Sequence, residues 1–410
     1  MIRGPERVNL ASNYRELFSY KSFCVFWLVR FIGISSYQIL TVVVAWQLYD
    51  LTGSALDLGF FGLSQFIPAL IFALPAGQAV DKYNRVRIVT LCLILQAIVC
   101  LSLLYSTTED FISREIIFLM GSVLGFTRSF QMPAQQSLTP ALVPRKILQT
   151  AVAFSSTGMH TAIIMGPALG GFLYFLGPSS VYLICTILLI ISCILTFFIK
   201  YSHERGIAKL SLLGMFAGIS FIWKNKTLLG AISLDLFAVL LGGATALLPI
   251  FAKDIFNVGP EGLGILRASP AVGALVCALV IAQWPMRRGV GKKLYFAVAI
   301  FGLAMLCFGL STNFLLSIAA LIIAGAADSF SVVIRMTLIQ LETPDFMRGR
   351  VSSVNAIFIG ASNELGEFES GATAAVLGPV GSIVLGALGT LMVVFAWTKL
   401  FPSLLKRETL

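Results

Sequence analysis

Three glutamates, Glu364, Glu367 and Glu369, lie within six residues of the stretch NELGEFESG, and apolar residues flank that stretch on both sides. A charged side chain at the centre of a bilayer costs about 3 kcal/mol even on lenient scales. On a helix, Glu364 and Glu367 are about 60° apart and share a face that Gly371 extends, whereas Glu369 points nearly away from Glu367. Two neighbouring carboxylates rarely ionise together in a low-dielectric medium. The pair is therefore suited to proton exchange, or to holding a cationic substrate.

Other charged residues also fall inside apolar segments. Asp235 and Asp328 are further acids, and the possible countercharges are Arg30, Arg128, Arg267 and Arg335. The candidates for proton or substrate binding are Arg30, Arg128, Asp235, Asp328, Arg335, Glu364 and Glu367. A structural alternative stays open, in which such charges only pair and fix helix packing, as Arg335 with Glu364 would. His160 is more typical of a hydrogen-bonded packing histidine than of a proton carrier.

The elements that must position these residues are membrane helices. Of the 410 residues, 58% are hydrophobic and 12% are charged, and the mean hydropathy of +0.91 is too high for a soluble protein. A helix needs about 20 apolar residues to cross a bilayer. On that basis we predict an all-α membrane protein with twelve transmembrane helices. They cover approximately residues 22–49, 55–79, 88–106, 114–137, 148–176, 179–200, 227–252, 263–284, 294–311, 314–338, 351–377 and 379–402.

The formal charge of +10 is distributed along the chain in a way that predicts its topology. Lys and Arg gather in alternate connections and at both ends of the chain, while the intervening connections hold only Arg114 and Lys253. By the positive-inside rule, both termini are cytoplasmic. The basic excess thus indicates anionic membrane lipids as partners and disfavours nucleic acid. The first apolar run is too long for a signal-peptide core, so we expect no cleaved signal.

The two halves of the chain resemble each other. TPALVPR begins at Thr139 and TPDFMRGR at Thr343, 204 positions later, and the same offset relates Asp50 to Asp254. We therefore predict two pseudo-symmetric six-helix bundles, residues 1–200 and 227–410, joined by a cytoplasmic amphipathic linker helix within 201–226. Parallel repeats of this kind form transporters with a central site at their interface, which rock to expose that site to either side.

The segment GQAVDKYNRVR carries a more specific pattern in the second connection. It resembles the G-x-x-x-D-[RK]-x-x-R-x-[RK] signature of the major facilitator superfamily. The matching residues are Gly77, Asp81, Lys82, Arg85 and Arg87. The resemblance implies the major facilitator fold and a cytoplasmic latch between the bundles, in which Asp81 faces the start of the eleventh helix at Ser352 and Ser353. The second-half copy, AQWPMRRGVGKK, lacks the acid, so the latch is expected to be one-sided.

A second element, GPALGG, lies in the fifth predicted span. It resembles the G-P-x-x-G-G element of antiporters in the same superfamily through Gly166, Pro167, Gly170 and Gly171. Small residues let helices cross closely and the proline kinks the helix, although ordinary transporter packing would look similar. Arg128 matches the fourth-span motif of the family only superficially, so that motif's proton-coupling role is not assigned to it. The resemblance also implies that the first, fourth, seventh and tenth helices line the cavity, with Arg30, Asp235, Asp328 and Arg335 facing it.

The stretch YDLTGSALDLGFFGL is similar to the secretion-effector branch, which includes siderophore exporters of the enterobactin type and macrolide-efflux pumps. We therefore predict a proton-coupled antiporter in a bacterial inner membrane that exports an amphipathic small molecule, a siderophore or a drug. Lipid flipping or uptake by a symporter on the same fold stays open, and a non-transporting membrane sensor is disfavoured. No phosphate loop, metal-ligand spacing or nucleophile set occurs, so we expect no enzyme, no metal and no cofactor, with the proton gradient as the energy source. A monomer is the default for this family.

Overall fold

The computed structural model describes residues 10–201, 212–283 and 289–408, and within these ranges every regular element is helical. The first half of the chain forms one group of helices. Its members are α1 (Leu10–Ser19), α2 (Lys21–Thr52), α3 (Ala55–Lys82), α4 (Arg85–Thr108), α5 (Arg114–Leu138), α6 (Leu148–Leu173) and α7 (Pro178–Thr196), with short 3₁₀ turns η1 (Thr139–Ala141), η2 (Arg145–Ile147) and η3 (Tyr174–Leu176). We call α2–α7 the N-terminal group.

The second half forms a matching set. It comprises α8 (Leu212–Lys224), α9 (Lys226–Gly242), η4 (Thr245–Leu247), α10 (Leu248–Ile250), the π-turn η5 (Phe251–Ile255), α11 (Pro260–Gln283), α12 (Val290–Leu310), α13 (Phe314–Glu342), α14 (Asp345–Leu400) and α15 (Pro402–Leu405). We call α9–α14 the C-terminal group. Within α14 the backbone breaks at Gly378, where φ is 76° and Pro379 follows. A left-handed glycine before a proline ends one helix and starts the next, so α14 is two helices in space.

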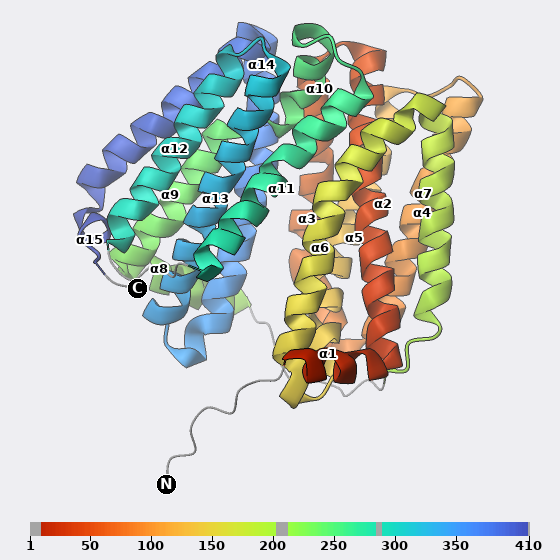
Figure 1. Ribbon diagram of the computed structural model, residues 1–410, viewed down its shortest axis with the longest axis horizontal. Coiled ribbons are helices and arrows are strands. Elements are labelled where there is room, and N and C mark those ends of the chain that lie inside the picture. The colour runs from red at the N-terminus through yellow and green to blue at the C-terminus, as the bar shows by residue number, and fades with distance from the viewer. Residues whose placement is uncertain (1–9, 202–211, 284–288, 409–410) are drawn as a thin grey trace.

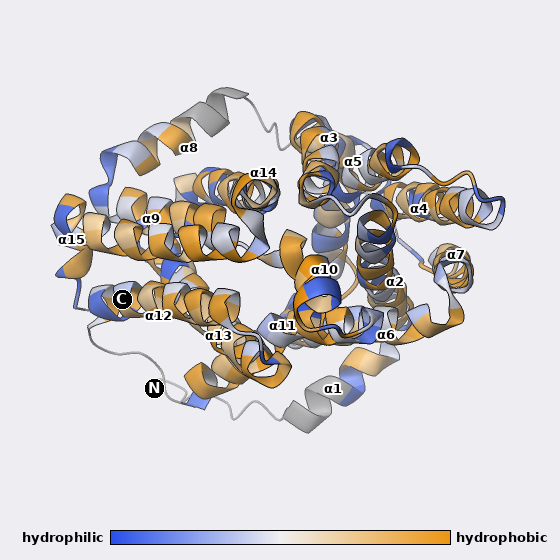
Figure 2. Cartoon of the chain, turned by 90° about the horizontal axis from the view of Figure 1, so that it is seen from above, coloured by the Kyte–Doolittle hydropathy of each residue, from blue (hydrophilic) through white to orange (hydrophobic). Residues whose placement is uncertain are grey.

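Ten helical segments in the described ranges are long and apolar enough to cross a membrane, with both parts of α14 counted as one. α5 is not among these ten, because it carries polar side chains such as Arg128, Gln131 and Gln135 along 25 residues. The all-α membrane fold is confirmed, and counting α5 and both parts of α14 is consistent with the twelve predicted spans. Many large apolar side chains are exposed, among them Ile71, Phe198, Leu315 and Met392. In Figure 2 most residues of the long helices have hydrophobic colours.

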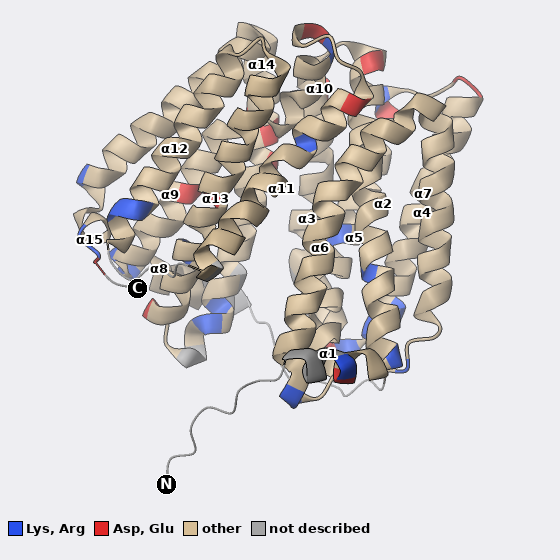
Figure 3. Cartoon of the chain, viewed as in Figure 1, with Lys and Arg blue, Asp and Glu red and all other residues tan. Residues whose placement is uncertain are grey.

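The two groups meet at one end of the molecule and diverge toward the other (Figure 1). Figure 3 shows many Lys and Arg residues toward the diverging end, where α1 and α8 lie, and several acidic residues at the end where the groups meet. We call these the basic end and the acidic end. The first described helix, α1, and the last, α15, both lie toward the basic end, as an even number of crossings between them requires.

Two helix pairs form the most extensive contacts between the groups, α3 with α14 and α6 with α11. Glycines make both approaches close. A Cβ atom at Gly371 would lie 2.9 Å from the Cα of Gly59, and one at Gly264 would lie 2.5 Å from the carbonyl oxygen of Pro167. Such distances are too short for any side chain, so small residues are required where the groups meet.

The predicted linker helix falls partly outside the described residues. The described part, α8, lies at the basic end and packs Ile222 against a buried cluster with Ile339 and Val351 of α13 and α14. The side chain of Trp223 is 71% exposed beside it. Both observations fit an amphipathic helix, and the exact limits of the linker and of the two domains stay predictions.

Candidate functional site

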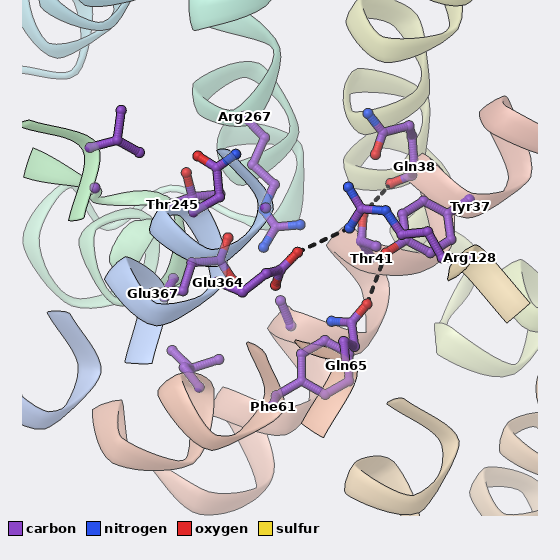
Figure 4. Close-up of a pocket in the computed structure, with 17 residues that line it drawn as sticks. Tyr37, Gln38, Thr41, Phe61, Gln65, Arg128, Thr245, Arg267, Glu364 and Glu367 are labelled. Carbon is purple, nitrogen blue, oxygen red and sulfur yellow. Dashed lines mark hydrogen bonds and ion pairs between the residues drawn. The ribbon is translucent and has the colours of Figure 1, made fainter. Parts of the chain in front are cut away.

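A cavity of about 300 Å³ lies between the two groups (Figure 4). The N-terminal group lines it with Tyr37, Gln38 and Thr41 of α2, Phe61 and Gln65 of α3, and Arg128 of α5. The C-terminal group lines it with Val239 of α9, Thr245 of η4, Arg267 of α11, and Asn363, Glu364 and Glu367 of α14. This site draws on both halves of the chain, as the internal repeat predicted.

An ion pair crosses the cavity from one group to the other. The Nη1 atom of Arg128 lies 3.0 Å from Oε1 of Glu364, although 236 positions separate the two residues in sequence. The arginine side chain is 45% exposed and the glutamate side chain 17%. The Arg128 guanidinium also lies 5.9 Å from the ring centroid of Tyr37, whose hydroxyl donates to Oε1 of Gln65 at 2.8 Å. A cation over an aromatic face adds about 1 kcal/mol of attraction when partly desolvated.

The other two charges of the cavity form no salt bridge within the described part of the chain. Glu367 follows Glu364 by one turn and packs on α3, so a Cβ atom at Gly62 would lie 3.0 Å from its Oε2. Arg267 extends from α11 into the cavity (Figure 4), and its buried Nε has no hydrogen-bond partner among the described residues. The cavity thus holds one ion pair, Arg128–Glu364, together with a cation, Arg267, and an anion, Glu367, that form no salt bridge with the described residues. The shared face predicted for Glu364 and Glu367 is confirmed.

Glu369 and Ser370 have other roles, as the helical geometry predicted for Glu369. The Oε1 atom of Glu369 accepts a hydrogen bond from Thr373 at 3.5 Å, on the side of α14 away from the cavity. Ser370 donates to the carbonyl oxygen of Gly243 at 2.5 Å. Gly243 lies where α9 has ended and η4 has not begun, so its carbonyl has no helical partner.

Four predicted cavity residues lie elsewhere. Asp235 of α9 forms a buried ion pair with Arg335 of α13, inside the C-terminal group. Asp328 of α13 lines a separate, smaller cavity. Arg30 donates to Oγ of Ser155 at 2.7 Å on α6.

The expectation that Arg30, Asp235, Asp328 and Arg335 face the central cavity is therefore wrong in this conformation. The suggested pair of Arg335 with Glu364 is also wrong, because each residue has a nearer partner of opposite charge. The physical reason is that α13 contributes no residue to the lining, and α9 contributes only its last turn.

Comparisons with known proteins agree with this architecture. The family model of the Major Facilitator Superfamily matches residues 26–366. The chain belongs to the Major Facilitator Superfamily. Enterobactin exporter EntS of Citrobacter koseri is 26% identical over 93% of this chain and 92% of its own length, and the protein of the same name from Escherichia coli O1:K1 is 25% identical with the same coverage. The resemblance to this superfamily and to its siderophore exporters is confirmed.

Solved structures of the superfamily show the same fold. The nucleoside transporter NupG aligns with a TM-score of 0.74 and 16% identity over 94% of this chain and 100% of its own. A bacterial homologue of the iron transporter ferroportin in an inward-facing state aligns with a TM-score of 0.71 and 16% identity over 94% of this chain and 99% of its own. The chain is thus a multi-pass membrane transporter of this superfamily.

The superfamily signature forms the turn between α3 and α4. Gly77 and Asp81 lie in the last turns of α3, and Asn84 caps α4 by accepting from the backbone N–H of Val86 at 2.9 Å. Arg85 donates to the carbonyl oxygen of Ser137 at 3.2 Å, which fixes the turn to the end of α5. Lys82 ends α3 and Arg87 lies in the first turn of α4.

The structure shows no hydrogen bond or ion pair of Asp81 with the residues that it describes. The eleventh helix also begins earlier than predicted, at Asp345 rather than beside Ser352. The latch at the basic end therefore stays a prediction, for a conformation in which the two groups approach each other there.

The GPALGG element lies where α6 touches both α2 and α11. A Cβ atom at Gly166 would lie 2.5 Å from Cβ of Gln38, and one at Gly170 would lie 2.9 Å from the carbonyl oxygen of Ile39. Gly171 lies against the backbone of Pro260 and Glu261 across the group boundary. The predicted close helix crossing is observed, with Pro167 inside α6, and the antiporter role of the element stays a prediction.

A pair of reciprocal links at the acidic end was missed by the sequence reasoning. The hydroxyl of Tyr49 donates to Asp254, and Lys253 forms an ion pair with Asp50. The two dipeptides Tyr49-Asp50 and Lys253-Asp254 are 204 positions apart, so each half offers one donor and one acid to the other. The repeat offset of the two aspartates was the available signal. We call these four residues the acidic-end clasp.

Proposed function

We propose that this transporter is a proton-coupled antiporter that exports an amphipathic, siderophore-like small molecule from a bacterial cytoplasm. The observation that carries the proposal is the Arg128–Glu364 pair, which joins the two groups inside the cavity. A link across the interface must be remade whenever the groups rock, so a ligand or a proton that competes for it can drive that motion.

The chemistry of the cavity supports a substrate with aromatic rings and anionic oxygens. Two guanidinium groups, Arg128 and Arg267, face the space, and the rings of Tyr37 and Phe61 line it. Guanidinium groups bind planar anionic groups well and stack on aromatic faces. The relatives named as enterobactin exporters favour a siderophore within this class.

Glu364 and Glu367 supply acidic groups for the proton side of the exchange. A proton on Glu364 would release Arg128 for an anionic substrate, and loss of that proton would restore the pair. Substrate binding would thus require a protonated Glu364, whereas the empty cavity would keep Glu364 ionised and paired with Arg128. This competition at one residue is the simplest basis for antiport. The positive-inside rule orients the basic end toward the cytoplasm, so the protein would be a multi-pass inner-membrane protein. We expect it to act as a monomer, with the proton gradient as its energy source.

Inside-out membrane vesicles with an imposed pH gradient test the proposal directly. Siderophores and lipophilic drugs are added singly, and the collapse of the gradient is followed by a fluorescent dye. We expect one compound class to release protons in the wild type, and at least a tenfold smaller release in Glu364→Gln/Glu367→Gln.

Glu109→Gln is the matched control, since it makes the same chemical change at an exposed position at the end of α4. No wild-type response to any compound would reject drug and siderophore antiport, and would turn attention to lipids or uptake. An unchanged response in the double variant would reject the assigned residues.

A further inference from the structure

A second, much smaller cavity lies inside the C-terminal group, away from the interface. Its volume is about 10 Å³, and its polar lining consists of Asp235 of α9 with Asp328 and Ser331 of α13. The remaining lining is apolar and includes Val298 and Phe301 of α12. A space of this size is on the order of one water molecule.

The charges around this cavity do not balance. Arg335 is 2% exposed and Asp235 6%, and the two form a buried ion pair. Asp328, two turns before Arg335 on the same helix, has no hydrogen bond or ion pair with the described residues. The cluster therefore carries two acids and one permanent cation. A second charge that stayed unpaired there would be costly, because low dielectric penalises a lone ion.

A further polar atom points to a ligand in this space. The hydroxyl of Ser331 is 2% exposed, has no hydrogen-bond partner among the described residues, and lines the cavity one turn from Asp328. Buried polar groups are nearly always satisfied by protein or by bound water.

We propose that Asp328, with the Asp235–Arg335 pair and Ser331, forms a proton-binding site distinct from the substrate cavity. The transferred proton arrives as a hydronium ion in the small cavity and adds to a carboxylate oxygen of Asp328, which leaves a neutral water molecule that the Ser331 hydroxyl can bind. A metal cation fits less well, because the Arg335 guanidinium already occupies one of the two carboxylates. The role of this proton in transport rests on the proposed function.

The two cavities share one side chain. Val239 lines both of them, one turn after Asp235 on α9. Beyond it α9 ends at Gly242, and the irregular backbone that follows places Gly243, Thr245 and Ala246 in the substrate cavity. If protonation of Asp328 moves α9, the residues at the end of α9 that line the substrate cavity would move with it.

The other charged groups near α13 do not compete for this site. α12 presents only uncharged residues to the small cavity, and the arginine of α11, Arg267, points into the large one. Cys277 of α11 is near Ser329, on a face of α13 where Ser329 donates to the backbone of Ala274.

Infrared difference spectroscopy of the purified, reconstituted protein tests the site without any substrate. Spectra taken across a pH step show the carbonyl stretch of protonated carboxylic acids. Glu364 and Glu367 also contribute to this band, so we expect one component of it to be lost in Asp328→Asn and kept in the control Glu369→Gln. Ser331→Ala leaves the Asp328 carboxyl in place and should only shift the frequency of its band. This second variant tests the site even if Asp328→Asn fails to fold. A wild-type band that survives unchanged in Asp328→Asn, or the lack of any such band, overturns the site.

Vesicle transport then separates the two proposals. If the wild type couples substrate to protons, Asp328→Asn should lose gradient-driven transport at least tenfold while keeping substrate exchange without a gradient. Full coupling in Asp328→Asn overturns the role of this site and leaves the antiporter proposal standing. A wild type without coupling rejects the antiporter, while the infrared band still decides whether Asp328 binds a proton.

Discussion

The acidic end and the basic end of this transporter differ in how the two groups are held together. At the acidic end, α3 packs on α14 and α6 on α11 through facing glycines, and the acidic-end clasp adds side-chain links between the groups. At the basic end the groups diverge, and the hydrogen bonds of the signature turn lie within one group, where Asn84 caps α4 and the signature residue Arg85 donates to the end of α5. The conformation is therefore one in which the acidic end is closed.

The difference shows which contacts must alternate. Backbone contacts at glycine do not depend on salt or pH, whereas the clasp includes an ion pair that is partly exposed, with Asp50 at 57% and Lys253 at 37%. Exposed ion pairs contribute about 0–1 kcal/mol. Helix packing should therefore contribute most of the stability of the closed acidic end, and the clasp should contribute a smaller part.

The largest effect is expected from Gly371→Leu. A Cβ atom there would already lie 2.8 Å from the carbonyl oxygen of Ala55, so a leucine forces α3 and α14 apart. We expect transport to fall more than tenfold. An Ala45→Cys reporter, placed on a buried cavity residue of α2 in a background without native cysteines, should become reactive to an impermeant maleimide from the acidic-end side.

Ala375→Leu is the matched control for that variant. It adds the same side chain one turn later on α14, at an exposed position. Equal reporter labelling in Gly371→Leu and Ala375→Leu would show that glycine packing does not hold the acidic end closed.

The same contrast explains what the sequence could predict. Apolar runs and basic connections depend on local composition, so the helical membrane fold was predictable from the sequence. The partners of buried charges depend on helix rotation, and each residue turns a helix by about 100°. A boundary error of two residues therefore moves a side chain to the opposite face.

Arg335 illustrates this limit. Its true partner, Asp235, lies 100 positions away on another helix, and no local pattern distinguishes it from Glu364. Arg128 and Glu364 likewise meet across 236 positions, through the packing of the two groups. By contrast, the common face of Glu364 and Glu367 was predictable, because helical geometry alone determines it.

A smaller effect is expected from the clasp. Asp50→Lys and Lys253→Asp each place like charges opposite each other, and the double exchange Asp50→Lys/Lys253→Asp restores an opposite pair. Each single variant should raise labelling of the Ala45→Cys reporter about two- to fivefold, which corresponds to up to about 1 kcal/mol, and the double variant should return it close to wild type. The difference should shrink as salt is raised, because exposed charges are screened.

The contact between Tyr49 and Asp254 is left unchanged in all three variants, so it continues to hold the acidic end closed and limits the increase in reporter labelling. A double exchange that labels as strongly as the single variants would mean that Lys253 and Asp50 act through other partners. High salt that leaves the single variants unchanged would contradict an electrostatic origin. Either result would assign the closure of the acidic end to the glycine contacts alone, and would make α3–α14 and α6–α11 the surfaces that substrate and proton binding must loosen.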